Sequence, residues 1–290
     1  MGAAGRAGAG DAERFDLVIE RGRLERNYWG DLWRYRELFY ILAARDLAVR
    51  YKQTSIGVVW ALLQPLLSMG VMTVVFGRVA GLQSEGGAPY AILVFAGGLP
   101  WMFFSSAVSS ASQSLVGNAN LISKVYFPRL IVPASAVVTA SADFLISLGL
   151  LGGLMAWHGF MPGVRLLALP VFAGMACAAA LGPGLLLTAL NVRYRDFRYV
   201  IPFLVQFGLY VSPVGFSSTV VREKLGESGF LAYSLNPMVG VIDGFRWAVL
   251  GGEVQMHWAG FLVSLGVTVI LLVVGVTYFR RTEKSFADVI

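Results

Sequence analysis

The stretch WAGFLVSLGVTVILLVVGVTYF, residues 258–279, contains no charged residue. An α-helix rises about 1.5 Å per residue, so a helix of this length reaches roughly 33 Å, enough to cross the hydrocarbon core of a bilayer. The whole chain is also rich in apolar residues, with 57% hydrophobic and 14% charged residues. Soluble domains average about 45–50% apolar and about 25% charged residues. The sequence therefore predicts an integral membrane protein.

Five further segments are apolar over a comparable length. The predicted spans are 57–79, 89–112, 130–156, 166–190, 199–217 and 258–279. The fifth is the shortest, and Pro202 and Pro213 make its ends the least defined. We expect an all-α membrane protein with six transmembrane helices, in which a disordered cytoplasmic tail (1–30) and an interfacial helix (31–56) precede the six-span domain (57–290).

The distribution of basic residues predicts the orientation, because cytoplasmic loops are enriched in Lys and Arg. If the N-terminus is cytoplasmic, the segments 1–56, 113–129, 191–198 and 280–290 face inward. They contain 18 of the 23 basic residues. Both termini are therefore expected in the cytoplasm. Topology also explains the net charge of +6, so no nucleic-acid partner is expected.

Residues 32–53, LWRYRELFYILAARDLAVRYKQ, precede the first span. Leu38, Phe39 and Leu42 share one helical face with Tyr35, and charges surround the rest. Aromatic and basic residues in this pattern favour a helix lying in the headgroup plane. The alternative is a soluble helix packed on another protein surface.

The segment 218–257 between spans five and six is mildly apolar but too short to cross. Asn236-Pro237 is a helix-start signal and Gly251-Gly252 a stop signal. We expect one or two re-entrant helices that dip in from the outer side, which is tolerated where protein or a water-filled cavity covers the backbone.

Motifs of soluble enzymes are missing from the sequence. It contains no GxxxxGK[ST], GxSxG or HExxH motif, so neither nucleotide binding by a P-loop nor a hydrolase or zinc-protease site is expected. A single cysteine, Cys177, and two isolated histidines do not provide a metal site. We expect no enzyme activity, no metal and no cofactor on this chain.

Polar and aromatic side chains recur at helical spacing inside several spans. In span five, Gln206, Tyr210 and Ser217 fall on one face with Pro213. Amides, hydroxyls and flat rings together suit a sugar, whereas small polar residues in membrane helices also serve close packing. The candidate pore-lining residues are Trp60, Gln64, Trp101, Gln206, Tyr210 and Ser217.

Asp143 is an acidic residue in the middle of the third span. A charge at this depth is costly and marks a functional or packing role. Ser135, Thr139 and Ser147 share its predicted face, which favours a structural hydrogen-bonding anchor over a direct substrate contact.

GNANLISKVYFPRLIVP, residues 117–133, is a short polar and basic segment between spans two and three. The positive-inside count places it in the cytoplasm, and Pro128 and Pro133 delimit it. Because the segment joins two spans, a force applied to it would move both of them. The alternative is an ordinary basic loop held by anionic headgroups.

Four blocks resemble, in the same order, the ABC-2-type permeases that export polysaccharides, the O-antigen and teichoic-acid exporter group. They are RDLAVRYKQTSIGVVWALLQPLLSMGVMTVVFGRV (45–79), GNANLISKVYFPRLIVP (117–133), NVRYRDFRYVIPFLVQFGLYVSPV (191–214) and LNPMVGVIDGFRWAVLG (235–251). The resemblance covers roughly residues 30–285. The first and last blocks are distinctive, and the spans between them are generic.

This resemblance implies one half of a homodimer in the plasma or inner membrane, with two copies of a separate ATPase that bind ATP and Mg²⁺. The substrate would be a lipid-linked polysaccharide. The implied ATPase-coupling residues are Asn118, Asn120, Lys124, Tyr126 and Arg129. The implied outer gate contains Asp243, Phe245, Arg246 and Trp247, where a local Asp243–Arg246 ion pair is the simpler alternative.

Other functions stay open on the sequence alone. A capsule, drug or lipid exporter of the same superfamily fits the same blocks. A secondary transporter would show inverted repeats and broken midplane helices, and a membrane glycosyltransferase would need a long acidic catalytic loop. A neighbouring open reading frame for a P-loop ATPase would favour the exporter.

Overall fold

The computed structural model describes residues 28–52, 57–252 and 254–286, and within these ranges its regular structure is entirely helical, as expected. The first half contains α1 (Tyr28–Arg34), α2 (Arg36–Lys52), α3 (Gly57–Met72), the π-helix η1 (Thr73–Val79), α4 (Tyr90–Gly117) and α5 (Ala119–Ile122). The second half contains α6 (Ile131–Trp157), the 3₁₀-helix η2 (Val164–Ala168), α7 (Leu169–Arg193), α8 (Phe197–Val211), α9 (Ser218–Tyr233), α10 (Pro237–Leu250), α11 (Trp258–Thr282) and the 3₁₀-helix η3 (Glu283–Ser285). Most of the expected N-terminal tail lies outside the described residues.

Among the described residues, five helical stretches are long and apolar enough to cross a membrane. They are Val59–Val79, Tyr90–Gly117, Ile131–Trp157, Val164–Arg193 and Trp258–Ser285. They correspond to the first four and the last of the expected spans. In place of the fifth, α8 has 15 residues, about 22 Å of helix, which is short of a hydrocarbon core of about 30 Å. The fifth span, 199–217, and with it the total of six spans, stays a prediction.

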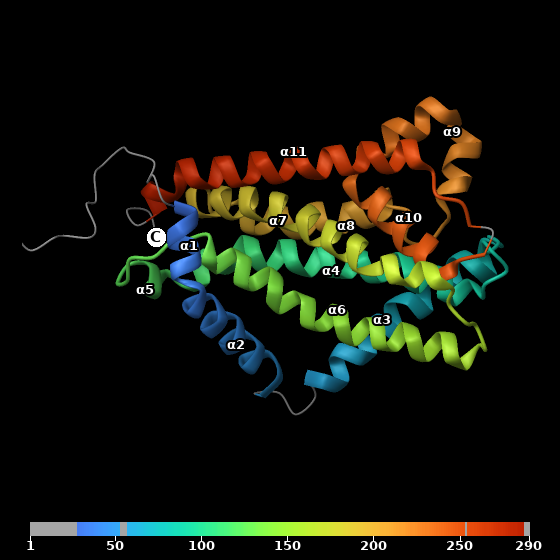
Figure 1. Ribbon diagram of the computed structural model, residues 1–290, viewed down its shortest axis with the longest axis horizontal. Coiled ribbons are helices and arrows are strands. Elements are labelled where there is room, and N and C mark those ends of the chain that lie inside the picture. Colours follow the sequence, from blue (N-terminus) through green and yellow to red (C-terminus); the bar gives the residue numbers. More distant parts are fainter. Residues whose placement is uncertain (1–27, 53–56, 253, 287–290) are drawn as a thin grey trace, which may run out of the picture.

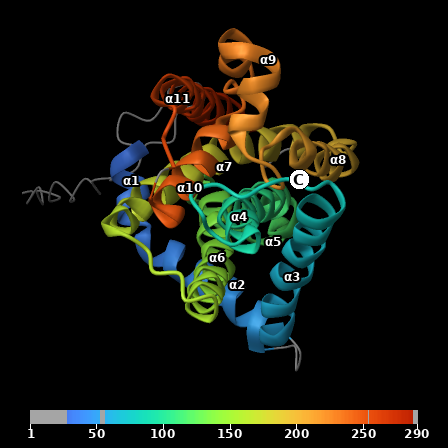
Figure 2. The same cartoon turned by 90° about the vertical axis from the view of Figure 1, so that its right-hand side faces the viewer.

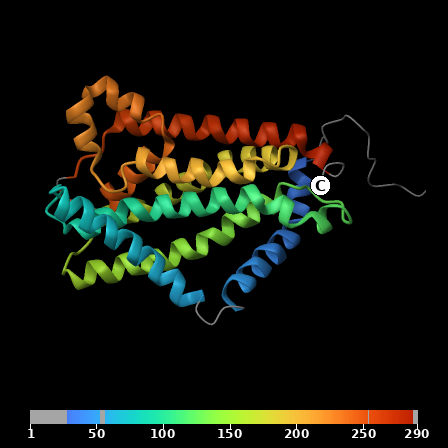
Figure 3. The same cartoon turned by 180° about the vertical axis from the view of Figure 1, so that it is seen from behind.

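The long helices lie side by side in a bundle (Figure 1). α4 is central and packs against α6, α7 and α10 (Figure 2), so it is the most buried span. α3 is the least buried, and with α2 it lies on the outside of the bundle (Figure 3). We call the end that holds α1, α5 and η3 the α5 end, and the opposite end, with α9 and residues 80–89, the α9 end.

α8 stops where local backbone chemistry requires it. Pro213 disfavours helical backbone in the residue before it, and Ser212 is extended, with φ −106° and ψ 148°. The polar stripe predicted along span five therefore ends at Tyr210. Placing Ser217 on the same helical face was wrong, because Ser217 caps α9 and its hydroxyl accepts from the Thr219 amide.

α10 begins and ends at the residues that the sequence signals. The Asn236 side chain accepts from the Met238 amide at 3.0 Å, which is an N-cap bond. Gly251 ends the helix with φ 57°, a conformation that glycine adopts without steric cost. Nearly all of α10 is buried among α4, α7 and α11.

α7 and α11 are in direct backbone contact. A Cβ atom built on Gly275 would lie 2.1 Å from the Gly182 carbonyl oxygen. We therefore expect Gly275→Ala to lower the free energy of unfolding by about 1–3 kcal/mol, the usual cost of overpacking, and to lower the thermal midpoint in detergent. The matched control is Gly266→Ala in the same helix, where a Cβ would meet nothing within 4 Å. An unchanged midpoint for Gly275→Ala would contradict this packing.

Candidate functional site

The coupling segment, residues 117–133, forms the tip of the α5 end (Figure 1). α4 runs on to Gly117, five residues beyond the predicted end, and α5 is a single turn. Lys124, Val125 and Tyr126 are exposed in the loop that follows, and Asn120 is exposed within α5. Residues 122–127 and Arg129 line a shallow depression of about 270 Å³. The tip therefore exposes a basic and partly apolar surface.

Buried side chains anchor the coupling segment to the bundle. Ile122 and Phe127 are 4% and 3% exposed and belong to a hydrophobic cluster at the α5 end. The side-chain nitrogen of Asn118 donates to the Ser114 carbonyl at 2.8 Å. Arg45 of α2 donates to the side-chain oxygen of Asn118, also at 2.8 Å. The tip is therefore exposed while its base is fixed.

Arg129 points toward the last turn of the chain instead of the tip. Its backbone N–H donates to Glu283 Oε1 at 2.6 Å, and its guanidinium donates to the Glu283 carbonyl oxygen. The Tyr28 hydroxyl donates to Glu283 Oε2 at 2.9 Å. Burial, followed by the Glu283 charge, raises the pKa of Tyr28, so its hydroxyl remains a donor. Sequence reasoning missed Glu283, which lies 154 positions from Arg129 without a local signal.

A pocket of about 610 Å³ lies among α2, α3, α4 and α6. Two predicted pore residues, Trp60 and Gln64, line it together with Ser105 and Ser109 of α4. The lining combines polar side chains with apolar ones such as Leu99 and Phe103, so the pocket can accept an amphipathic ligand.

Asp143 lines the same pocket and is paired with α2. It forms a salt bridge with Arg50 and accepts a hydrogen bond from the Tyr51 hydroxyl. Burial and then this hydrogen bond raise the pKa of Tyr51 to about 12. The expected neighbours Ser135 and Thr139 bond backbone carbonyls of their own helix instead. Asp143 therefore holds the end of α2 against α6, a contact that the face pattern could not reveal.

Gln206 and Tyr210 lie on the exposed face of α8. Phe203 and Phe207 extend this face and stack with ring centroids 6.2 Å apart. Trp101 is not on this exposed face. It is 5% exposed and is covered by α8, because a Cβ on Gly208 would lie 2.7 Å from its ring. The exposed faces of α3 and α8 thus carry four of the six predicted pore residues, Trp60, Gln64, Gln206 and Tyr210.

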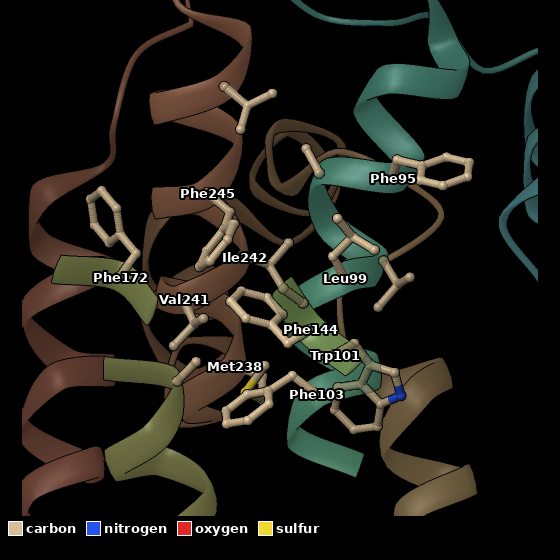
Figure 4. Close-up of a cluster of buried hydrophobic side chains, with 14 of the residues drawn as sticks. Phe95, Leu99, Trp101, Phe103, Phe144, Phe172, Met238, Val241, Ile242 and Phe245 are labelled. Atoms are coloured by element: carbon tan, nitrogen blue, oxygen red, sulfur yellow. The ribbon is translucent and has the colours of Figure 1, made fainter. Parts of the chain in front are cut away.

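α9 and α10 form a helical hairpin at the α9 end (Figures 1 and 2). α9 is kinked at Gly226, where φ is 71°. Phe245 is fully buried and meets Phe144 of α6 edge-on at 5.8 Å (Figure 4). Trp247 packs on Phe172 at 6.2 Å. In this conformation Phe245 therefore lies in the hydrophobic core, and Trp247 packs against that core while partly buried.

Arg246 and Asp243 make separate contacts. The Arg246 guanidinium donates to the carbonyl oxygens of Phe216 at 2.8 Å and Val214 at 2.9 Å, and its Nε contacts that of Leu93 at 3.4 Å. Asp243 accepts from Ser218 at 2.5 Å. Arg246 is only 2% exposed, so it ties α10 to α4 and to the segment after α8. It acts as more than a surface ion-pair partner.

A second pocket of about 590 Å³ opens beside the hairpin. Its lining includes Glu85, Ser217, Asp243, Arg246 and His257. Glu85 accepts from the hydroxyls of Ser217 and Thr219. Ser217, predicted to line the pore with α8, thus belongs to this second pocket.

Comparison with known proteins identifies the family of this chain. Residues 37–250 match the family model of the ABC-2 type transporter. The chain is 30% identical over 259 residues to the O-antigen export system permease protein RfbA of Myxococcus xanthus, which covers 89% of this chain and 97% of that protein. It is 26% identical over 255 residues to RfbA of Klebsiella pneumoniae (88% and 95% covered) and 20% identical over 250 residues to the polysialic acid transport protein KpsM of Escherichia coli (84% and 93%). The chain belongs to the ABC-2 type transporter family.

Proposed function

We propose that this chain is the transmembrane subunit of an ATP-driven exporter that moves a lipid-linked polysaccharide of the O-antigen type out across the plasma or inner membrane. The observation that carries the proposal is the near full-length similarity to the two O-antigen export permeases. The sequence has no P-loop motif, so ATP and Mg²⁺ belong on a separate ATPase. Two copies of this chain and two ATPase subunits form the complex.

The orientation follows from the basic residues. The α5 end faces the cytoplasm, because it carries Lys124, Arg129, Arg280 and Arg281 close to the ends of spans. The α9 end then faces outward. The exposed coupling tip, with Asn120, Lys124 and Tyr126, docks on the ATPase, while Asn118 and Arg129 hold its base.

The translocation pore lies between the two copies and is lined by the exposed faces of α3 and α8. α3 is the least buried span, which suits a helix that completes its packing against a second copy. Gln206 and Tyr210 supply hydrogen bonds to sugar hydroxyls, and Phe203 and Phe207 offer flat apolar faces to sugar C–H groups. The α9–α10 hairpin closes the outer mouth at rest, and Asp243, Phe245, Arg246 and Trp247 hold it shut.

The function can be tested with the purified complex in proteoliposomes. This chain alone is expected to hydrolyse no ATP, because it has no nucleotide site. Together with the ATPase, it should move the lipid-linked polysaccharide of its own host across the membrane only when ATP is present. The control is a complex whose ATPase carries an inactivated P-loop lysine. ATP hydrolysis by the pure chain alone, or export without ATP, would exclude the proposal.

The pore can be tested in the same proteoliposomes by cysteine substitution after Cys177→Ala. A small charged thiol reagent on the outer side should label positions 206 and 210 faster when ATP drives the complex. The control positions 205 and 209 lie on the half-buried face of α8 and should react slowly throughout. Equal labelling of both pairs would mean that Gln206 and Tyr210 pack against other helices and do not line a pore.

A capsule-type polysaccharide is the second candidate substrate, favoured by the similarity to KpsM. A strain of the source organism in which this gene is deleted distinguishes the two substrates, when its surface O-antigen and its capsule are both measured. Loss of surface O-antigen with intact capsule supports the first substrate, and the reverse supports the second.

A further inference from the structure

Glu283 joins three parts of the chain at the α5 end. Its carboxylate accepts from the Arg129 backbone N–H at 2.6 Å through Oε1 and from the Tyr28 hydroxyl at 2.9 Å through Oε2. Its carbonyl accepts from the Arg129 guanidinium. Bonds to a charged group are about twice as strong as neutral ones. The residue that follows α11 therefore holds both the base of the coupling segment and α1.

Packing around Glu283 reinforces these bonds. The Arg280 guanidinium lies over the Tyr28 ring at 4.4 Å. Phe279 and Phe286 are 0% and 1% exposed, with ring centroids 5.3 Å apart, and they belong to the same hydrophobic cluster as Phe127. A displacement of the coupling segment therefore acts on the end of α11 as well as on α4 and α6, to which the segment is covalently joined.

The other end of α11 is bound to the α9–α10 hairpin. Ser264 Oγ donates to the Ser234 carbonyl at 2.8 Å and accepts from the Gly240 amide at 3.1 Å. A Cβ on Gly240 would lie 2.6 Å from Ser264 Cβ, so the hairpin turn sits directly on α11. Ser264 and Glu283 are 19 positions apart in the sequence, which corresponds to about 28 Å of helix axis.

α11 is a continuous helix between these two contacts, from Trp258 to Thr282 and without an internal proline. It lies along the full length of the bundle, from the α5 end to the α9 end (Figure 1). Helices of this kind move as rigid units past one another in shear motions. α11 is thus placed to carry a movement at one end to the hairpin at the other.

We propose that Glu283 is a positioning residue that transmits ATPase-driven movement of the coupling segment to the outer α9–α10 hairpin through α11. This inference rests on the proposed function, because it needs an ATPase that moves the coupling segment. α4 also contacts α10, so the experiment has to separate a route through α11 from one through α4.

The test compares Glu283→Ala, Ser264→Ala and the double variant in proteoliposomes that contain the complete complex. Polysaccharide exported per ATP hydrolysed is measured. Each single variant should keep its ATP hydrolysis within about twofold of the wild type and export roughly tenfold less per ATP. Because both residues act on one helix, the double variant should be no worse than the poorer single variant, which is the signature of coupled sites.

A direct readout follows the hairpin itself. Leu235 is 59% exposed at the hairpin turn, so Leu235→Cys in a Cys177→Ala background reports its accessibility to a charged thiol reagent. ATP should change the labelling rate in the wild-type complex and in Glu283→Gln, whose amide oxygen still accepts from the Arg129 N–H. Glu283→Ala should remove the ATP-dependent change.

Two matched substitutions control for local damage. Ser285→Ala removes a hydroxyl that bonds the Thr282 carbonyl in the same turn, and Thr268→Ala removes one that bonds the Ser264 carbonyl within α11. Both should export as the wild type does.

Full export per ATP by Glu283→Ala, or additive losses in the double variant, would overturn the inference. If Glu283→Ala gives no folded complex, the Ser264→Ala arm decides alone, and its unchanged export per ATP has the same meaning. A wild-type complex without ATP-dependent export would contradict the proposed function instead.

Discussion

Arg246→Met should yield little folded protein and a strongly lowered thermal midpoint. Methionine occupies a similar volume but donates no hydrogen bond, so the carbonyl oxygens of Phe216 and Val214 lose their donor in a buried site. Each buried polar group left unsatisfied costs about 1–3 kcal/mol, a large share of a typical stability of about 5–15 kcal/mol. Thermal unfolding and the yield of monodisperse protein in detergent measure the effect.

The matched control is Arg222→Met on α9, because Arg222 is exposed. It should leave both the yield and the midpoint unchanged. Arg246→Lys should fall between the two, since a single ammonium group cannot reach all the carbonyls that a guanidinium does. If Arg246→Met unfolds at the wild-type midpoint, the contacts of Arg246 do not hold the hairpin in place.

Replacing Lys124, Val125 and Tyr126 with three glycines should abolish export and leave the fold intact. All three side chains are exposed, so their removal costs the subunit little stability. At an interface, losing one buried aromatic anchor costs about 2 kcal/mol or more, roughly thirtyfold in affinity. Capture of the ATPase by the detergent-solubilised variant should therefore fall by at least this factor.

A matched control removes exposed apolar side chains at the other end of the bundle. Met161 in the loop after α6 is 89% exposed, and Val164, the first residue of η2, is 80% exposed. Glycine at these two positions should affect neither ATPase capture nor export. Normal export by the triple-glycine variant would mean that residues 117–133 are an ordinary loop.

Local signals were sufficient to predict most helices of this fold. The uncharged run at 258–279 and four other apolar runs became helices with ends within a few residues of those expected, because length and hydropathy act residue by residue. The caps of α10 were equally readable from Asn236 and Gly251. α8 shows the limit, since the apolar run continued to residue 217 while Pro213 had already stopped the helix. Its signal was present in the sequence but was outweighed by hydropathy.

The candidate site was less predictable, because its contacts join distant parts of the chain. Lys124 and Tyr126 are exposed at the tip, as a docking role requires, and the short basic segment alone indicated this. The pairing of Asp143 with Arg50 and of Arg129 with Glu283 depends on how helices pack, which no spacing pattern reports. Trp101 was misplaced for the same reason: a face pattern shows that residues align, but not whether a neighbouring helix covers them.

The burial of α10 also bears on how the subunit is made. A guanidinium such as that of Arg246 opposes insertion of its segment into lipid during synthesis, and α10 is too short to cross. In the orientation proposed above, the hairpin is therefore expected to reach the outer side as a translocated loop and to fold back afterwards. The hairpin packs in part on α11, to which Ser264 bonds it. Because α11 leaves the ribosome later than α10, this packing forms only after α11 has been made. In that orientation, the hairpin would complete its folding on the outer surface, after α11 has been synthesised.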